Sequence, residues 1–478
     1  MRNAETTQTG TPEVPRPTAS GNERCNVVMI LTDDQGVWAA GCYGNAEIRT
    51  PNIDRLAETG TRFDNFFVAT PVCSPSRATL LTGRIPSQHG IHDWISGGNV
   101  GAEALRYLEG GDTYTDILAR HGWRCGISGK WHLGDSQLPQ CGFTDWYVHQ
   151  SGGGDYNAAP MVRDGELVTE TRYITDVITD EALAMLARYA RARVPFYLSV
   201  HYTAPHSPWT GHPEETVQSY DDCPFASCPQ EPRHPWAVSF TDQHLGNRAS
   251  LKGYFAAVTA MDANVGRILD ALEAHGLRES TLVIFLSDNG FSCGHHGFWG
   301  KGNGTRPLNM YENSVKVPAI LSHPGGVREQ HVQDMVSAYD FRPTLLEYLG
   351  IPMPDDPSRP GTSFAGLLRD GQAQRRDHVV VFDEYGPVRM IRTQEWKYVH
   401  RHPAGPHELY DLRNDPEERT DLVSDPGHRR HIRELKAEME EWFTRYVIPS
   451  RDGLRQPGVE RTPTYPSGLG AGQSRLVR

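Results

Sequence analysis

The stretch NVVMILTDD at residues 26–34 decides the fold class that this sequence predicts. Residues 26–32 form a short, nearly continuous apolar run, which is typical of a β-strand buried on both faces. The stretch TLVIFLSDN at residues 281–289 has the same plan, an apolar run that ends in an acidic residue and a polar partner. Further strands are predicted at Trp123–Ser128 and Phe196–Tyr202. Strands of this kind belong to parallel sheets that helices cover.

Helical segments lie between these strands. Apolar residues at helical spacing predict helices over Asp176–Ala190 and Tyr254–His275. A chain in which strands alternate with helices folds most simply into a parallel sheet with its connections packed on the faces. We therefore expect an α/β fold, a mixed and mainly parallel sheet with helices on both faces.

The pattern changes after the Pro- and Gly-rich stretch Pro352–Gly371. Three short strands separated by turns are predicted, which is typical of an antiparallel sheet. These strands are His378–Phe382, Val388–Arg392 and Lys397–His400. A helix is predicted over His428–Val447, with one apolar face. That face is formed by Ile432, Leu435, Met439, Trp442 and Phe443. We expect a smaller C-terminal antiparallel subdomain against which this one helix packs.

The 478 residues accordingly divide into four parts. Residues 1–24 are polar and rich in Pro and Thr, which predicts a disordered leader. Residues 25–370 form the predicted larger α/β domain and residues 371–449 the C-terminal subdomain. Residues 450–478, rich in Gly, Pro and Arg, are predicted to form a loose tail.

Composition excludes several classes of protein. The formal net charge is −12, which gives no basic footprint for nucleic acid. No apolar run approaches the ~20 residues that span a bilayer, so no membrane segment is expected. The first residues lack the pattern of a signal peptide, which favours a cytoplasmic location and leaves an unusual export route open. Eight cysteines without a CxxC motif do not make a disulfide scaffold, although Cys223 and Cys228 either pair or remain free thiols.

Acidic and amide side chains follow two of the predicted strands. Asp33 and Asp34 end the first, and Asp288 and Asn289 end the strand at 281–287. Ligands of open parallel sheets bind at the carboxyl ends of the strands, so these four side chains should share one crevice. Oxygen donors of this type suit Ca²⁺ or Mg²⁺. The alternative is that the two pairs form turns that cap helices.

Positive and titratable groups follow the other strands. Lys130 and His132 lie after the second strand, His206 after the third, and Lys301 in a Gly-rich loop beyond Asp288. Taken singly, each fits a solvated lysine or a hydrogen-bonded histidine. Taken together around a divalent cation, they describe a pocket for an anion.

The stretch CSPSRATLLTGR at residues 73–84 predicts a helix start, with Cys73 just before the helix. Pro75 suits a first helical turn, and the free N–H groups there favour an anion or a nucleophile. The alternative is a buried, inert cysteine ahead of an ordinary helix.

Several motifs in order resemble the type I, formylglycine-dependent sulfatase family of the alkaline-phosphatase-like superfamily. Residues 73–77 with the TGR at 82–84 resemble its signature C-x-P-S-R, and GKWHLG at 129–134 resembles its second signature. SDNG at 287–290 and YEN at 311–313 also resemble the family. The resemblance covers about residues 26–422 and implies a sulfuric ester hydrolase with an alkaline-phosphatase-like fold.

The resemblance also implies a role for each motif residue. Cys73 would be oxidised to formylglycine by a separate maturation enzyme, because a hydrated aldehyde has a second hydroxyl through which sulfate can be expelled. Residue 73 would bind the metal, Ca²⁺ or alternatively Mg²⁺, together with Asp33, Asp34, Asp288 and Asn289. Arg77 and Lys130 would stabilise charge, His132 would be the base, and His206 and Lys301 would bind sulfate and donate a proton towards the leaving oxygen.

The substrate is predicted more loosely. Side chains next to the motifs are candidates for contact with it, namely Asp93, Trp94, Trp209, Trp299, Asn303 and Arg306. Tryptophan rings stack on sugars but are also ordinary packing residues. We expect a sulfated carbohydrate, with a small aryl or alkyl sulfate still open. Two alternatives remain: a phosphate or phosphonate ester hydrolase on the same fold, and an inactive protein that binds sulfated glycans. The oligomeric state is left open.

Overall fold

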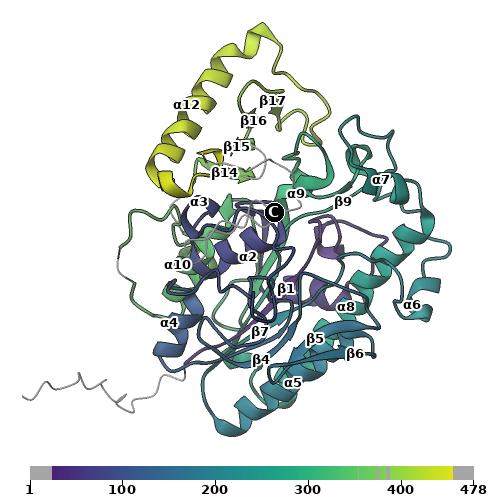
Figure 1. Ribbon diagram of the computed structural model, residues 1–478, viewed down its shortest axis with the longest axis vertical. Helices are drawn as coiled ribbons and strands as arrows, with labels where there is room; N and C mark the ends of the chain where they lie inside the picture. Colours follow the sequence, from purple (N-terminus) through teal and green to yellow (C-terminus); the bar gives the residue numbers. More distant parts are fainter. Residues whose placement is uncertain (1–23, 354, 373–375, 384–387, 456–478) are drawn as a thin grey trace, which may run out of the picture.

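An 11-stranded sheet forms the centre of the computed structural model, which describes residues 24–455 except 354, 373–375 and 384–387 (Figure 1). Most of the predicted leader and tail lies outside the described residues. In spatial order the strands are β12 (Gln330–Val332), β2 (Thr61–Phe67), β11 (Lys316–Ser322), β8 (Thr281–Ser287), β1 (Asn26–Thr32), β7 (Phe196–His201), β3 (Arg124–Gly129), β4 (Phe143–His149), β5 (Ala159–Arg163) and β6 (Glu166–Glu170), with β13 (Val336–Ser337) paired to β2.

The middle of this sheet is parallel, as predicted. Strands β8, β1, β7, β3 and β4 pair in parallel with their neighbours. Antiparallel strands extend it on both sides, β11 next to β8 and β5 and β6 beyond β4. The bounds of β1 and β8 agree with the prediction, whereas β3 and β7 differ from it by one residue.

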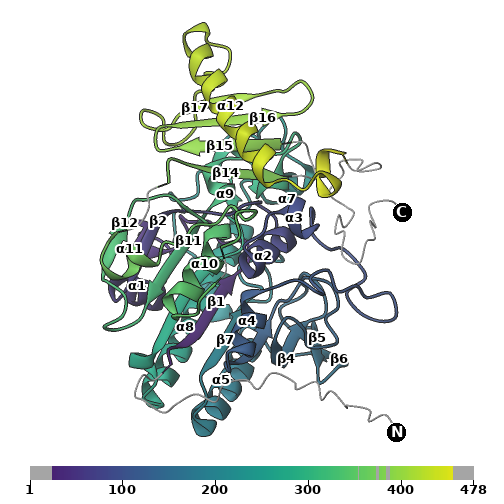
Figure 2. The same cartoon turned by 90° about the vertical axis from the view of Figure 1, so that its left-hand side faces the viewer.

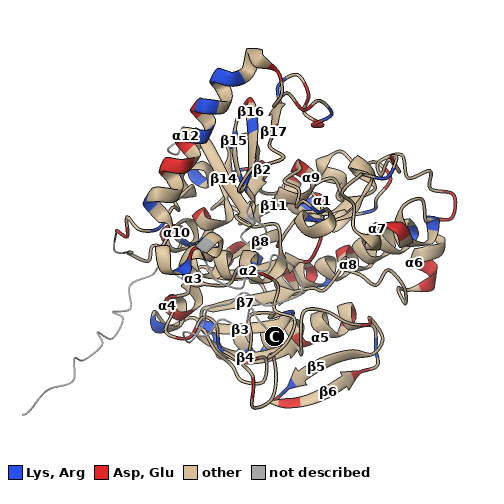
Figure 3. Ribbon diagram, turned by 45° about the horizontal axis from the view of Figure 1, so that its top comes forward, with Lys and Arg blue, Asp and Glu red and all other residues tan. Residues whose placement is uncertain are grey.

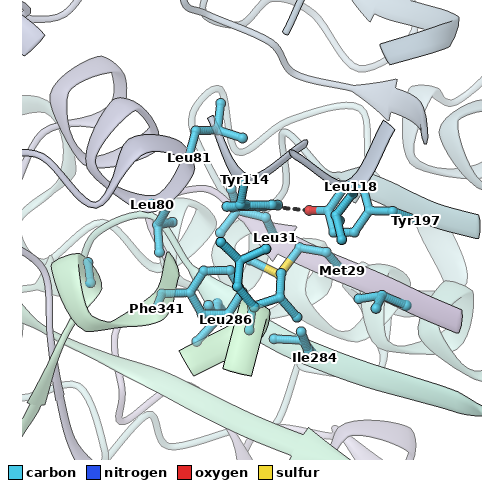
Figure 4. Packing of buried hydrophobic residues seen from close by; sticks show 14 of the residues in the cluster. Met29, Leu31, Leu80, Leu81, Tyr114, Leu118, Tyr197, Ile284, Leu286 and Phe341 are labelled. Carbon is cyan, nitrogen blue, oxygen red and sulfur yellow. Dashed lines mark hydrogen bonds between the residues drawn. The ribbon is translucent and has the colours of Figure 1, made fainter. Parts of the chain in front are cut away.

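Side chains of β1 alternate between two hydrophobic cores, one on each face of the sheet. Val27, Met29 and Leu31 belong to the first core and Val28 and Ile30 to the second. Figure 4 shows the first core between the sheet and its helices. That face is covered by α2 (Cys73–Thr82), α4 (Tyr114–Arg120) and α10 (Ala338–Tyr348), and the opposite face by α1 (Pro51–Glu58), α5 (Ile174–Ala192) and α8 (Arg248–Ala274).

The remaining elements are short. The helices are α3 (Pro86–His89), α6 (Glu214–Gln218), α7 (Ser239–His244), α9 (Glu312–Val315) and α11 (Ala365–Arg369). A small hairpin is formed by β9 (Ser292–Cys293) and β10 (Trp299–Gly300). Single 3₁₀ turns are η1 (Gly41–Tyr43), η2 (Arg278–Ser280), η3 (His295–Gly297), η4 (Gly302–Gly304), η5 (Pro426–His428), η6 (Pro449–Arg451) and η7 (Gly453–Arg455). Within the described part of the chain no helix is both long and apolar enough to cross a membrane.

A second, antiparallel sheet follows, as predicted, with a packed helix (Figure 2). Its strands are β14 (His378–Asp383), β15 (Val388–Thr393), β16 (Trp396–Arg401) and β17 (Glu408–Asp411), of which β17 is not predicted from the sequence. Helix α12 (Arg429–Tyr446) packs Leu435, Met439, Trp442 and Phe443 against this sheet. Its outer face carries charges of both signs (Figure 3), including the pair Arg430–Glu434.

The small sheet also packs against the segment that leads into α2. Val379, Val381 and Met390 share a hydrophobic cluster with Phe67 and Val72 of the larger part. Val72 immediately precedes Cys73 and is the N-cap residue of α2. The second sheet therefore packs against the N-cap residue of this helix. The predicted division between residues 370 and 371 falls between α11 and β14.

Candidate active site

Side chains from two strand ends and one helix start meet in a buried cluster. Asp33 and Asp34 follow β1, Asp288 follows β8, and Cys73 begins α2. One ligand atom from each of these four side chains lies within 4.8 Å of the others. Neither acidic pair caps a helix, since the next helical turns start at Gly41 and His295. The shared edge of a parallel sheet thus concentrates hard oxygen donors at one point.

Each of the three carboxylates faces a cationic side chain. Lys130 Nζ donates to Asp33 Oδ2 at 2.5 Å, and Arg77 Nε donates to Asp288 Oδ2 at 2.8 Å. Lys301 Nζ donates to Asp34 Oδ1. Burial disfavours a charged carboxylate, so these ion pairs offset the cost of burying three carboxylates together.

The pKa values of two of these carboxyls move in opposite directions. Burial alone would raise the pKa of Asp33, but the charges of Lys130, His206 and Lys301 outweigh it and hold that pKa well below the usual range. Burial and the neighbouring charge of Asp33 together raise the pKa of Asp288. Asp33 is therefore the carboxylate that stays ionised, and Asp288 is the one whose ionisation an additional cation would favour.

Cys73 lies buried at the start of α2, between a carboxylate and a lysine. It is the first residue of α2, not the residue before it as the sequence suggested, and no side chain caps that helix. Its Sγ donates to Asp33 Oδ1 at 3.4 Å and lies 2.8 Å from Lys301 Nζ. Burial, and then the charge of Asp33, raise the pKa of the Cys73 thiol to about 12. The thiol therefore stays protonated near neutral pH and is not itself an activated nucleophile.

The donor set fits a divalent cation with a preference for oxygen. Asn289 Nδ2 donates to Asp34 Oδ1 at 2.7 Å and to the carbonyl of Gly290. Its Oδ1 is buried and has no hydrogen-bond partner among the residues that the structure describes. A buried amide oxygen without a partner is unfavourable, so this atom and the adjacent carboxylates suit a cation such as Ca²⁺ or Mg²⁺.

His132 offers one free ring nitrogen. Its Nε2 lies 3.0 Å from the carbonyl oxygen of Ile95, which can only accept a hydrogen bond, so Nε2 carries the proton. Its Nδ1 is buried and has no partner in the described part of the chain. Burial, and then the charge of Lys130, lower the pKa of His132 well below its usual value. The ring is therefore neutral, with a lone pair available on Nδ1.

His206 lies nearest to solvent among the site residues. Its side chain is 28% exposed, and its Nε2 lies 3.8 Å from Asp34 Oδ2. Its Nδ1 donates to the carbonyl of Ser207 at 2.7 Å. The Tyr156 hydroxyl donates to the backbone carbonyl of His206 at 2.8 Å. These bonds fix the ring with Nε2 turned towards the carboxylate cluster.

Arg77 connects the cluster with the neighbouring strand. Besides Asp288 it donates from Nη1 to the carbonyl of Lys130 at 2.9 Å. Its Nη2 is buried and without a hydrogen-bond partner within the described residues. A buried guanidinium donor that the protein leaves unpaired is suited to an anionic ligand.

The loops predicted to contact substrate fall into two groups. The loop of Asp93 and Trp94 lies at the site, because the next residue, Ile95, contacts His132 and its amide donates to Ser74 Oγ at 3.1 Å. Asn303 lies in the turn that follows Lys301, and this turn packs against Pro71 through Gly302. Arg306 lies a few residues further on and is exposed. Whether these side chains contact substrate stays a prediction.

Trp209 and Trp299 lie in the hydrophobic core instead. Their exposed fractions are 5% and 0%, and their ring centroids are 4.9 Å apart. Trp209 also packs edge-on against Phe291 and His244. With both rings enclosed, they are packing residues, which is the alternative that the sequence left open, and the sugar-stacking role is not supported.

Two histidines near the site were not predicted from the sequence. His201 ends β7, and its Nδ1 donates to the carbonyl of Lys130 at 3.0 Å. His149 ends β4, and its pKa is lowered to about 4 by burial and then by the charge of Lys130. Their position at strand ends is the signal that would have identified them, but β4 itself is not predicted. Cys223 and Cys228 are both free thiols, so the predicted alternative without a disulfide applies.

A mainly parallel sheet with an acidic cluster at its carboxyl edge places the protein in the alkaline-phosphatase-like class of hydrolases. Residues 25–351 match the sulfatase family, and residues 294–445 match the family described as N-sulphoglucosamine sulphohydrolase, C-terminal. The chain therefore belongs to the sulfatase family, whose members are sulfuric ester hydrolases. The family and fold predicted from the sequence are confirmed.

Known relatives include sulfatases of carbohydrates. An N-acetylglucosamine-6-O-sulfatase of Bacteroides thetaiotaomicron is 27% identical over 90% of this chain and 88% of its own length. An ulvan-active sulfatase of Formosa agariphila is 28% identical over 87% and 80%. A solved structure in complex with its substrate D-glucosamine-2-N,6-O-disulfate superposes with a TM-score of 0.77 at 25% identity, over 91% of this chain and 100% of the other.

Proposed function

We propose that this sulfatase hydrolyses the sulfate ester of a carbohydrate, using a formylglycine made from Cys73 and a divalent cation, Ca²⁺ or alternatively Mg²⁺. The observation that carries the proposal is the cluster in which Cys73 and three carboxylates present ligand atoms within 4.8 Å of one another. A protonated, buried thiol does little chemistry there by itself. A modified side chain would account for the position of residue 73 between the carboxylate cluster and Lys301.

The chain's own residues would hold the two groups. Asp33, Asp34, Asp288 and Asn289 would bind the cation, and residue 73 would complete its coordination. When present, the cation and the formylglycine supply a hydroxyl that is nucleophilic at neutral pH and a polarised sulfate oxygen. Lys130 and Arg77 keep Asp33 and Asp288 in place through the bonds described above.

Two side chains would bind the sulfate oxygens. Lys301 Nζ lies 2.8 Å from Cys73 Sγ and remains charged, because the charges of Asp34, Asp33 and Asp288 raise its pKa more than burial lowers it. Arg77 Nη2 is the second donor, buried and unpaired among the described residues. Positive groups fixed where charge develops stabilise the transition state without having to reorganise.

Proton transfer would be shared between two histidines. His132 is neutral with a free Nδ1, which suits a base that takes up a proton when sulfate is expelled. His206 has its Nε2 near Asp34 and is partly exposed, which suits proton donation to a leaving oxygen that extends towards solvent. A correctly placed acid or base contributes about 10²–10⁴-fold to a rate.

The carbohydrate class of substrate is proposed from the relatives. One is named an N-acetylglucosamine-6-O-sulfatase, one is named as active on ulvan, and the solved structure holds D-glucosamine-2-N,6-O-disulfate. In this chain Cys73 is 3% exposed, so only a small group such as sulfate reaches it. Asn303 and the exposed Arg306 are the polar side chains that we propose contact the hydroxyl groups of the sugar, whereas Asp93 is 2% exposed and accepts a hydrogen bond from the Trp94 amide.

The first experiment is mass spectrometry of the tryptic peptide that ends at Arg77, from protein made together with a formylglycine-generating enzyme. We expect conversion of the Cys73 thiol to an aldehyde, and an unmodified thiol under these conditions would contradict the mechanism. Release of inorganic sulfate is then measured from N-acetylglucosamine 6-sulfate, N-acetylgalactosamine 6-sulfate, choline sulfate and an aryl sulfate. We expect an amino-sugar sulfate to be preferred.

Two controls separate this proposal from its alternatives. Cys73→Ala should abolish sulfate release, whereas Cys223→Ser, which removes a partly buried thiol elsewhere, should leave it intact. Aryl phosphate and aryl sulfate with the same leaving group are compared directly, and faster phosphate release would identify a phosphoesterase instead. Tight binding of a sulfated glycan without any sulfate release by the modified protein would identify a binding protein.

A further inference from the structure

Three consecutive glycines lie against three histidines of the site. Gly152, Gly153 and Gly154 form the loop after β4. The side chain nearest to Gly152 is His132 and that nearest to Gly153 is His206, whereas Gly154 lies nearest to Pro160 and then to His149. The amide of Ser151, just before them, donates to Nδ1 of His149 at 3.2 Å, which fixes the start of the loop. The loop is half-buried and its backbone approaches the site without side chains of its own.

Gly152 makes the tightest of these approaches. A β-carbon at this position would lie 2.5 Å from Cε1, 2.6 Å from Nε2 and 3.0 Å from Nδ1 of His132. Contacts below 3.0 Å are sterically forbidden, so an alanine here would require the ring or the loop to move. The φ angle of Gly152 is not positive, so glycine is present for close approach and not for a special backbone conformation.

The His132 ring has little freedom to avoid such a contact. It is 3% exposed, and its Nε2 is bonded to the carbonyl of Ile95 on one side. Its own backbone has a φ of 57°, a conformation that few non-glycine residues adopt. The ring is therefore fixed at Nε2 by the Ile95 carbonyl, and the bare backbone of Gly152 lies close to its Nε2 and Cε1 atoms.

We propose that Gly152 is a positioning residue for His132, which holds the imidazole by backbone contact so that Nδ1 keeps its place in the site. This inference rests on the proposed function only in that His132 is the residue that takes up a proton there. The packing itself does not depend on that function. A shift of about 1 Å in a catalytic group can cost about 10²-fold in rate, so this contact has a kinetic consequence.

The same loop provides matched controls. A β-carbon on Gly153 would lie 3.5 Å from Nδ1 of His206, an ordinary van der Waals distance. A β-carbon on Gly154 would lie 2.9 Å from Cδ of Pro160 and 3.2 Å from His149, which is crowding away from His132. Gly153→Ala therefore adds a methyl group without a clash, and Gly154→Ala adds strain to the loop without touching His132.

The test that is independent of activity is a double-mutant cycle of stability. Gly152→Ala should lower the thermal unfolding midpoint by several degrees in the wild-type background. In the His132→Ala background the ring is gone, so the same substitution should produce no lowering. If Gly152→Ala fails to fold alone but folds together with His132→Ala, the proposal is supported. An equal lowering in both backgrounds would overturn it.

The second readout is the ring itself. In ¹⁵N-histidine-labelled protein, the His132 signals, assigned with His132→Gln, should show a proton on Nε2 in the wild type, Gly153→Ala and Gly154→Ala. They should change in Gly152→Ala. With a sulfate ester that the enzyme turns over, kcat of Gly152→Ala should fall about 10- to 100-fold with KM nearly unchanged. Equal losses in Gly152→Ala and Gly154→Ala would instead indicate general strain. If no ester is hydrolysed, the proposed function fails while the cycle and the spectra still decide this inference.

Discussion

Charge at the centre of this site is balanced residue by residue. Asp33, Asp34 and Asp288 each have a lysine or arginine as partner, and all of these groups are largely buried. A buried pair is weak evidence for stability, but removal of one partner leaves an uncompensated charge. Substitutions that test this site should therefore keep the size and shape of a side chain and change only its charge or its ability to bind a proton.

The role of His132 is tested by a variant that keeps a polar side chain of similar size. His132→Gln removes the free Nδ1 lone pair and should lower kcat by about 10²–10⁴-fold. The measurement is steady-state sulfate release, with the thermal midpoint as a check on folding. His212→Gln, which alters a buried histidine bonded to Tyr173 at 3.0 Å, is the matched control. An unchanged kcat in His132→Gln would remove this residue from the mechanism.

The role of Asp288 is tested through the cation. Added Ca²⁺ should raise the thermal midpoint of the wild-type protein after treatment with a chelator, because a ligand that binds only the folded state stabilises it. In Asp288→Asn one charged donor is lost, so a higher Ca²⁺ concentration should be needed for the same rise. Asp270→Asn changes a carboxylate that is 70% exposed and should behave as wild type. Mg²⁺ in parallel samples shows which cation the site prefers.

At the scale of the element, the strands that could be predicted are those whose residues show a clear local pattern. The continuous apolar runs of β1, β7 and β8 and the polar residues at their ends are visible without a structure. Strand β4 was missed because Thr144 and Asp145 interrupt its apolar run and, in the structure, face outward or pair with arginines. Without β4, neither His149 at its end nor the glycine loop beyond could be placed at the site.

The enclosed tryptophans show the other limit of sequence reasoning. Trp209 and Trp299 are near motif residues in the chain, yet whether a ring faces a crevice or a core depends on elements that pack there from elsewhere. Here Phe240, Tyr254 and Phe291 cover Trp209. Contact between distant segments is not encoded in spacing, so the metal and nucleophile motifs are easier to predict than the contacts with the sugar.

Strand β16 makes the small sheet sensitive to acid. His400 stacks on His407 with ring centroids 4.3 Å apart, and His402 lies 4.5 Å away. Burial, followed by the charges of His402 and His407, lowers the pKa of His400 to about 3. In the unfolded chain the pKa of His400 is near 6.5. Burial of the neutral ring therefore has its full stabilising effect above pH 6.5, and the free energy of unfolding falls as the pH drops from 6.5 towards 3. Urea midpoints at several pH values should show a smaller acid loss in His400→Asn than in wild type.

At the scale of the whole molecule, one buried lysine connects the small sheet to the larger part of the protein. Lys397 of β16 lies 2.6 Å from Glu312 of α9 and 2.6 Å from Glu418, and it also donates to the carbonyl of Met310 at 2.9 Å. The small sheet is thus fixed to the larger part by charge as well as by the hydrophobic cluster around Val72. Loss of this connection should affect the start of α2.

Lys397→Met should therefore destabilise the protein. Without the ammonium group Glu418 loses its cationic partner, while Glu312 still pairs with Arg392. Removal of one partner of a buried pair costs about 3–5 kcal/mol in comparable cases. The free energy of unfolding from urea titration measures this. Lys397→Met combined with Glu418→Gln removes the uncompensated charge and should recover part of the loss. If the single and double variants are equally unstable, the connection does not depend on charge.

The position of Cys73 also has a consequence for how the protein is made. In the finished fold this side chain is 3% exposed, and the lysine that lies against it is 228 residues further along the chain. A ribosome releases the amino end first, so the thiol remains reachable while the covering segment has yet to be synthesised. If residue 73 becomes a formylglycine, as we propose, the oxidising enzyme would have to reach the thiol before the fold closes over it, and molecules that fold first would stay inactive.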